Sequence, residues 1–326
     1  MRSLLLLAAL MFLTGCPQYP AGPLVFVTNE RDGTISVIDP RTEKLIDTIL
    51  TGARPRGIRV SASGRHAYVA VSSPMNGDQR PDENSVRVID TSTGALVKTI
   101  NVGMDPEQLA VDNDEKRIYV SNEDGGTLTV VDLATGLTVA TLITGIEPEG
   151  VTISPDGKRV YVMAETSSTV TVVDTEKLTV VATFLVGARP RDAAFSSDGM
   201  RAYISAELGQ NLSVVDTVSN TVTATVPLSA GDAKPVGVAV SVNGSKIYVA
   251  NGRGNSISVL DAEALKLVKT IAVGQRVWGL ALEPASGKLF AANGLSNSVS
   301  VIDTASDKVI ATIPAGDGPW GVAVRQ

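Results

Sequence analysis

The stretch "GVTISPDGKRVYVMAETSSTVTVVDTEKLTVVATFLV", residues 150–186, contains four short runs rich in β-branched residues. The runs are "GVTIS", "RVYVM", "TVTVVD" and "VVATFLV". "SPDGK" places Pro, Asp and Gly as a tight turn requires, and the aspartate that ends "TVTVVD" can bond the backbone of the turn it opens. Because no run of about 10–15 residues keeps a 3.6-residue period, the stretch predicts strands and no helix.

The third of these runs occurs seven times in the chain, each time ending in an aspartate. It reads "ISVID", "VRVID", "LTVVD", "VTVVD", "LSVVD", "ISVLD" and "VSVID", with 51, 42, 42, 42, 45 and 42 residues between successive aspartates. Seven four-stranded units with this period predict an all-β fold, a seven-bladed β-propeller with four-stranded blades. The aspartates are Asp39, Asp90, Asp132, Asp174, Asp216, Asp261 and Asp303.

The two ends of the repeat predict how the ring closes. The first unit begins at a second strand, "PLVFVTN" (23–29), and the chain ends with an isolated first strand, "GVAVRQ" (321–326). We expect the C-terminal strand to pair with the N-terminal strands in one blade, because this pairing leaves no long unpaired edge.

One aromatic position recurs in all seven second strands. A ring repeated in every unit is expected to pack between blades, and the repeated aspartates are likewise expected to be structural. The aromatic residues are Phe26, Tyr68, Tyr119, Tyr161, Tyr203, Tyr248 and Phe290.

The first 23 residues differ in composition from the repeat. Residues 1–16, "MRSLLLLAALMFLTGC", have one Arg before an apolar run that is too short to span a bilayer. "LTGC" resembles a bacterial lipoprotein signal, which implies cleavage before Cys16 and its lipidation; the alternative is an ordinary secretory signal. Residues 17–23, "PQYPAGP", are predicted to be a Pro-rich tether, and residues 24–326 the propeller. We expect an exported protein on the periplasmic or cell-surface side, lipid-anchored to a membrane.

Composition excludes several kinds of function. The 326-residue chain has a formal net charge of -6, which argues against a general nucleic-acid binder. His66 is the only histidine and Cys16 the only cysteine, so a histidine-based triad, a His-rich zinc site and a catalytic thiolate are not available to the mature chain. We therefore predict no catalytic residue, no metal and no cofactor.

The two faces of the predicted ring differ. In a four-stranded meander, the turns after the first and third strands share one face, here called the repeating face, because these turns read alike in every unit. The loops that lead into the first strand and leave the second share the opposite face, here called the individual face. Its residues are acidic in blades 3 and 4, paired arginines in blades 2 and 5, and tryptophans in blades 7 and 1.

We predict that the individual face binds a protein partner or a small anionic ligand. Arginines would contact carboxylates and the tryptophans would stack on a planar group or anchor a partner. The alternative is that the charges only pair with neighbouring blades, where each pair adds little stability. The predicted site residues are Arg54, Arg56, Glu107, Glu123, Glu149, Glu165, Arg189, Arg191, Glu207, Arg276, Trp278 and Trp320.

A nine-residue insertion in blade 2 lies within "SSPMNGDQRPDENS", residues 72–85, on the same face. Its Pro/Gly-rich, polar composition predicts a long exposed loop. Oxygen ligands for Ca²⁺ are present, but the regular spacing of a calcium loop is absent.

The repeat is similar to a known family. "RVYVMAE", "RIYVSNE", "KIYVANG" and "NSVSVIDTASDKVIATIPAG" resemble the YVTN-type β-propeller repeats over 24–326. The order of the loops "RPRG", "DPEQ", "EPEG", "RPRD", "KPVG", "RVWG" and "PWGV" resembles a subgroup associated with pyrroloquinoline-quinone-dependent alcohol catabolism and transport. The resemblance implies a non-enzymatic scaffold accessory to such a system. The tryptophan-docking repeats of quinoprotein dehydrogenases are missing, so the chain is not expected to hold the quinone.

Two other functions are compatible with the sequence. Rim carboxylates such as Glu107 with Glu123, or Glu149 with Glu165, could do the acid–base work of a propeller hydrolase or lyase. The arginines and tryptophans could bind single-stranded nucleic acid, although the acidic blades oppose it.

Overall fold

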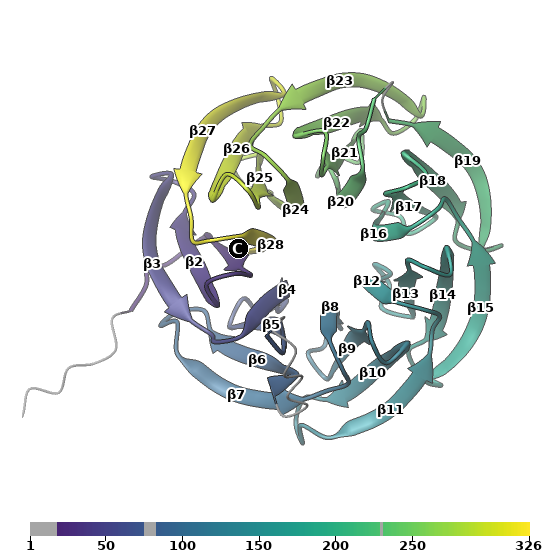
Figure 1. Cartoon of the computed structure of the whole chain (residues 1–326), viewed down its shortest axis with the longest axis horizontal. Helices are drawn as coiled ribbons and strands as arrows, with labels where there is room; N and C mark the ends of the chain where they lie inside the picture. The colour runs from purple at the N-terminus through teal and green to yellow at the C-terminus, as the bar shows by residue number, and fades with distance from the viewer. Residues whose placement is uncertain (1–17, 75–82, 229–230) are drawn as a thin grey trace, which may run out of the picture.

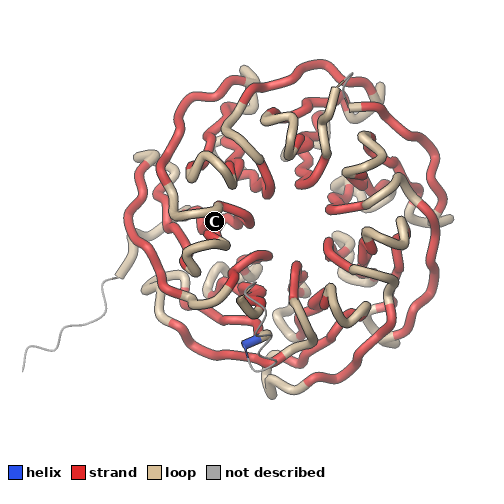
Figure 2. The backbone as a smooth tube through the Cα atoms, in the orientation of Figure 1, coloured by secondary structure: helices blue, strands red, loops and turns tan. Residues whose placement is uncertain are grey.

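The computed structural model describes residues 18–74, 83–228 and 231–326, which form a ring of seven four-stranded antiparallel sheets (Figures 1 and 2). The prediction of a seven-bladed propeller is confirmed. Blades 1 to 4, from inner to outer strand, are β28 (Pro319–Arg325), β1 (Leu24–Asn29), β2 (Thr34–Asp39), β3 (Lys44–Leu50); β4 (Arg54–Val60), β5 (His66–Ser72), β6 (Ser85–Asp90), β7 (Leu96–Asn101); β8 (Pro106–Val111), β9 (Arg117–Asn122), β10 (Thr127–Asp132), β11 (Thr138–Ile143); β12 (Pro148–Ile153), β13 (Arg159–Ala164), β14 (Thr169–Asp174), β15 (Thr179–Leu185). Blades 5 to 7 are β16 (Pro190–Phe195), β17 (Arg201–Ala206), β18 (Asn211–Asp216), β19 (Thr221–Pro227); β20 (Pro235–Val240), β21 (Lys246–Asn251), β22 (Ser256–Asp261), β23 (Lys266–Ala272); β24 (Val277–Glu283), β25 (Lys288–Asn293), β26 (Ser298–Asp303), β27 (Lys308–Pro314).

The ring closes in blade 1 as the sequence predicts. The C-terminal strand β28 is the inner strand of this blade and pairs antiparallel with β1, with Leu24 opposite Arg325 and Phe26 opposite Ala323. The pairing joins the first and last strands of the propeller, so the sheet has no open end at the termini.

The core lies between blades. Each hydrophobic cluster joins neighbouring sheets; one contains Tyr119 of blade 3 with Val162 of blade 4, and another contains Val27 of blade 1 with Phe290 of blade 7. All seven residues at the recurring aromatic position are buried. The prediction of an aromatic packing layer between units is confirmed, and the burial of such rings is a major part of the free energy that holds blade to blade.

The repeating face is made of turns that use the same hydrogen bonds. In every blade the aspartate that ends the third strand accepts a backbone N–H two or three residues later, for example from Ser92 to Asp90 at 2.8 Å and from Thr135 to Asp132 at 2.8 Å. These bonds confirm that the repeated aspartates are turn residues.

The described part of the predicted tether contacts the repeating face. The Tyr19 backbone N–H donates to the carbonyl of Ser92 at 2.6 Å, and its hydroxyl donates to Asp47 Oδ2 at 2.5 Å. Arg325 donates to the carbonyls of Pro20 and Gly22 at 2.6 and 2.7 Å. Residues 19–22 therefore lie against blades 1 and 2.

Several predictions concern residues outside the described part of the chain. These are the signal segment 1–16 with Cys16, residue 17 of the tether, and residues 75–82 of the insertion. Within the described residues, no helix is long and apolar enough to cross a membrane.

Candidate functional site

The individual face surrounds the mouth of the central channel, where the inner strands β4, β8, β12, β16, β20, β24 and β28 begin (Figure 1). A recurring backbone contact shapes its rim. The residue that follows the second strand donates its N–H to the carbonyl of the residue that precedes the inner strand, as from Glu123 to Asp105 at 2.9 Å and from Glu207 to Arg189 at 2.8 Å. This contact places the two side chains of each blade side by side.

The rim backbone is also strained. Asp105, Glu147, Arg189 and Lys234 each precede a proline and have φ between 51° and 59°. The left-handed region is costly for residues with a Cβ. The rim side chains are therefore presented from backbone that the rest of the blade holds in place.

The arginines of blade 2 form one cluster with carboxylates of blades 1 and 3. Arg56 lies 2.9 Å from Glu30 Oε1, contacts Glu107, and lies 3.5 Å from Glu123. Arg54 is 3.2 Å from Glu30 and 3.5 Å from Asp105. Glu107 is fully buried. The cluster bridges three neighbouring blades.

The arginines of blade 5 form a second, more buried cluster. Arg191 contacts Glu165, is 2.7 Å from Glu149 and is 3.5 Å from Glu207. Arg189 is 2.7 Å from Glu165 and 3.4 Å from Glu207. The side chains of Arg191 and its three carboxylate partners are all less than a tenth exposed. Arg276 of blade 7 extends this cluster, with its guanidinium 3.9 Å from Glu207.

The two clusters leave an excess of negative charge. Within the described residues, seven carboxylates of the network face five guanidiniums. Burial raises the pKa of Glu123 to about 7 and that of Glu149 to about 8. Burial opposes ionisation of Glu165 as well, but Arg189 and Arg191 hold its pKa below the ordinary value. The excess charge is therefore concentrated where the two clusters meet.

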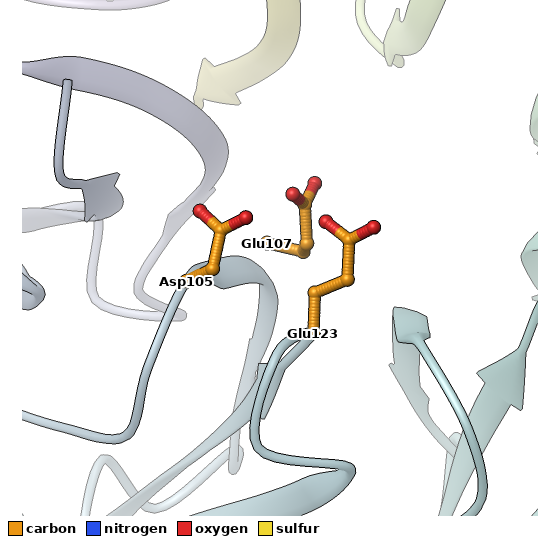
Figure 3. A group of neighbouring side chains, drawn as sticks. All are labelled: Asp105, Glu107 and Glu123. Carbon is orange, nitrogen blue, oxygen red and sulfur yellow. The ribbon is translucent and has the colours of Figure 1, made fainter. Parts of the chain in front are cut away.

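Two overlapping groups of carboxylates lie at this junction. One contains Asp105, Glu107 and Glu123, whose carboxyl groups converge in Figure 3. The other contains Glu123, Glu149 and Glu165, and in each group one oxygen per residue lies within 4.8 Å of the others. Oxygen sets of this kind suit Ca²⁺ or Mg²⁺. However, Arg56 and Arg191 already neutralise part of both groups.

The tryptophans of blades 7 and 1 meet at the same mouth. Trp278 and Trp320 stack with ring centroids 5.9 Å apart and an interplanar angle of 28°. The guanidinium of Arg276 lies 4.2 Å from the Trp278 ring centroid and that of Arg191 lies 5.4 Å from it. The tryptophan pair thus adjoins the cluster of blade 5.

All twelve rim residues of the predicted site lie around this mouth, and the two clusters and the tryptophan pair bring them together. Sequence reasoning missed the residues one position deeper in the channel. A cavity open to solvent at the mouth encloses about 300 Å³. Its lining includes Gln108, Glu149, Arg191, Asp192, Trp278 and Trp320. A signal for Gln108 and Asp192 existed, because the same position of the inner strand is glycine in the other five blades.

Comparison with known proteins agrees with the fold. The family model of the choice-of-anchor I domain matches residues 20–234. The chain belongs to this family. The model of the seven-bladed β-propeller lactonases matches residues 174–309. The chain is thus a seven-bladed propeller of the lactonase and YVTN-like kind, and nothing in the comparisons supports the quinone-associated subgroup. No curated protein is significantly similar to it.

Solved structures share the fold at low sequence identity. Hydrazine synthase of Kuenenia stuttgartiensis has a TM-score of 0.77 at 24% identity, covering 86% of this chain and 92% of that chain. A functionally unknown protein from Desulfotomaculum acetoxidans has a TM-score of 0.78 at 17% identity, covering 92% and 98%. A putative 6-phosphogluconolactonase from Bacteroides fragilis has a TM-score of 0.77 at 18% identity, covering 95% and 100%. At these identities the similarity concerns the fold alone.

Proposed function

We propose that this chain is a lipid-anchored, extracytoplasmic binding module without enzymatic activity, and that it recognises a protein or a small ligand at the mouth of its channel. The observation that carries the proposal is the tryptophan pair. Nothing in the repeat requires Trp278 or Trp320, yet both line the cavity together with the charged side chains of blades 4 and 5. Aromatic side chains beside a cavity are frequent anchors for binding.

The arginines support the proposal less directly. Arg56 and Arg191 are each engaged by three carboxylates, so they stabilise neighbouring blades whether or not a ligand is bound. Reversing their charge would test folding before it tested binding. The accessory role in quinone-dependent alcohol catabolism rests on the sequence resemblance alone.

The N-terminal contacts bear on orientation. Tyr19 is fixed to the repeating face, and only two residues lie between it and Cys16. Two residues span at most about 7 Å when extended. A lipid on Cys16 would therefore hold the repeating face toward the membrane and leave the individual face directed away from it. Cys16→Ser should release the protein from membranes, and its retention there would contradict the anchor.

Trp278→Ala tests the binding proposal. The wild-type protein and this variant are used to capture ligands or proteins from an extract of the compartment outside the cytoplasmic membrane. Val218→Ala, on an exposed turn of the repeating face, is the control. We expect the Trp278 variant to lose what wild type and control retain, with all three proteins folded by circular dichroism. Equal capture by all three proteins would refute recognition at the mouth.

A hydrolase or lyase is the second candidate. Glu123 and Glu149, with pKa values raised by burial to about 7 and 8, have the proton affinity that an acid–base group needs near neutral pH. A screen of lactone hydrolysis with wild type and Glu123→Gln tests this candidate. Turnover that the substitution abolishes would favour the enzyme over the binding module. Single-stranded nucleic acid is the least favoured ligand, because the network carries excess negative charge.

A further inference from the structure

The channel narrows one residue below the rim, at a position where five blades have glycine. These glycines allow close approach between blades: a Cβ on Gly237 would lie 2.5 Å from the carbonyl oxygen of Trp278, and Gly57, Gly150, Gly279 and Gly321 are equally confined. Side chains at this level are therefore the exception. Blades 3 and 5 supply them, as Gln108 and Asp192.

Both exceptions are supported by the same device. Ser121 accepts the backbone N–H of Gln108 at 3.1 Å and donates to the carbonyl of Glu149 in the next blade at 2.5 Å. Ser205 accepts the backbone N–H of Asp192 at 3.2 Å and donates to the carbonyl of Val236 at 2.5 Å. The serines bridge each non-glycine strand to its neighbour, so these side chains are built into the packing.

The two side chains present acceptor atoms that lack donors. Asp192 Oδ2 accepts the N–H of Val238 at 3.1 Å, but Oδ1 is shielded from solvent and has no hydrogen-bond partner. Gln108 is 9% exposed, and its Oε1 is also unpartnered. Within the described residues no cation lies at ion-pair distance from Asp192; Arg59 acts on it only through its field and donates to the carbonyl of Ile58. Buried acceptors without donors are costly, and they favour a ligand that donates.

The remaining walls of the cavity favour a cation. The tryptophan faces carry negative quadrupoles, and two guanidiniums of the protein itself already lie near Trp278. Arg191 is the one cation among the lining residues, and three carboxylates already pair with it. An anion would therefore meet the oxygens of Glu149, Asp192 and Gln108 with no free positive charge.

The size of the enclosed end selects among cations. It has room for one or two water-sized groups only. An ammonium group fits this space and carries three donors, whereas a planar guanidinium is wider and carries five.

We propose that the channel mouth binds a primary alkylammonium group, with the nitrogen donating to Asp192, Glu149 and Gln108 and the methylene stem lying against the tryptophans. The inference rests on the proposed binding function and names the chemistry of the ligand. A free amine and a lysine side chain of a partner protein present the same group.

Intrinsic fluorescence tests the proposal directly, because both tryptophans of the chain lie in this cavity. The protein is titrated at constant ionic strength with n-butylammonium, n-butanol and butyrate. We expect a saturable change with the ammonium only. Asp192→Asn should weaken the binding at least tenfold, while Asp198→Asn, in an exposed turn of the repeating face, should leave it unchanged. No saturation in wild type, or an equal response to butanol, would overturn the proposal without reliance on any variant.

A second arm separates the sources of the ligand. The peptide acetyl-Gly-Lys-Gly-amide binding more tightly than n-butylammonium would point to a lysine of a partner protein, and weaker binding would point to a free amine; a lack of binding by both would overturn the proposal. The capture experiment is then repeated with excess n-butylammonium. A partner that requires Trp278 but is not displaced refutes the ammonium inference and leaves the binding function intact. Capture that is independent of Trp278 refutes the binding function itself.

Discussion

The two faces of the ring are built from the same strands but use charge in different ways. On the repeating face, each aspartate accepts backbone N–H groups of its own turn, and the arrangement is the same in all blades. On the individual face, carboxylates and arginines of different blades pair with each other, and two blades add tryptophans. The difference teaches that a charge in every blade supports local structure, whereas a charge in one blade depends on its neighbours.

The largest difference between the faces is expected when one charge is removed. Arg191→Ala leaves three buried carboxylates without their shared partner and should lower the free energy of unfolding by about 3–5 kcal/mol. Lys116→Ala, which breaks an ion pair of two exposed side chains on the repeating face, should change it by less than about 0.5 kcal/mol. Urea denaturation measures both values. Similar losses would remove the distinction between the faces.

The pH dependence of stability should come from the individual face. Burial raises the pKa of Glu123 and Glu149 to about 7 and 8, above the values near 4.5 of the unfolded chain. The folded protein thus binds more protons, and its stability should fall as pH rises from about 5 to 8, by about 1.4 kcal/mol per pH unit for each group that retains its proton. Glu149→Gln should flatten part of this slope. Melting temperatures that rise over this range would contradict the assignment.

Backbone crowding should distinguish the faces next. Gly237→Ala puts a Cβ against the carbonyl of Trp278 and should cost about 3 kcal/mol, with a change in tryptophan fluorescence. Gly157→Ala, on the repeating face, meets no atom within 4 Å and has only the strain of its φ of 72°, about 1 kcal/mol. Denaturation of the two variants compares these costs. A larger loss for Gly157 would place the tighter packing on the wrong face.

The smallest effects should be equal between blades. Asp132→Ala and Asp216→Ala each remove the acceptor of a turn and should each cost about 1–2 kcal/mol. Their difference, measured by urea denaturation, should stay below about 0.5 kcal/mol. Unequal losses would show that the repeating face is less uniform than its sequence.

Most of the fold could be predicted from the sequence because every unit repeats the same information. Seven copies of the aspartate turn and of the aromatic position determine strand order, and the cut repeat determines closure between β1 and β28. The rim residues could be assigned to one face for the same reason. Their partners could not, because pairing of Arg191 with Glu149 and Glu165 depends on how the blades lie side by side.

The deeper channel shows the same limit. Gln108 and Asp192 depart from a glycine position, which is visible in the sequence once the blades are aligned. That both lie in one cavity with Trp320 depends on the curvature of the ring, which the local pattern does not specify.

Photo-cross-linking in the native membrane tests most directly whether the individual face is the binding face. A photoreactive amino acid replaces Leu208, which is 55% exposed beside Glu207 on the individual face, or Met200, which is 49% exposed on a turn of the repeating face. The account predicts adducts with a partner or ligand from position 208 and none with that molecule from position 200. The reverse pattern, or equal adducts from both positions, would contradict it.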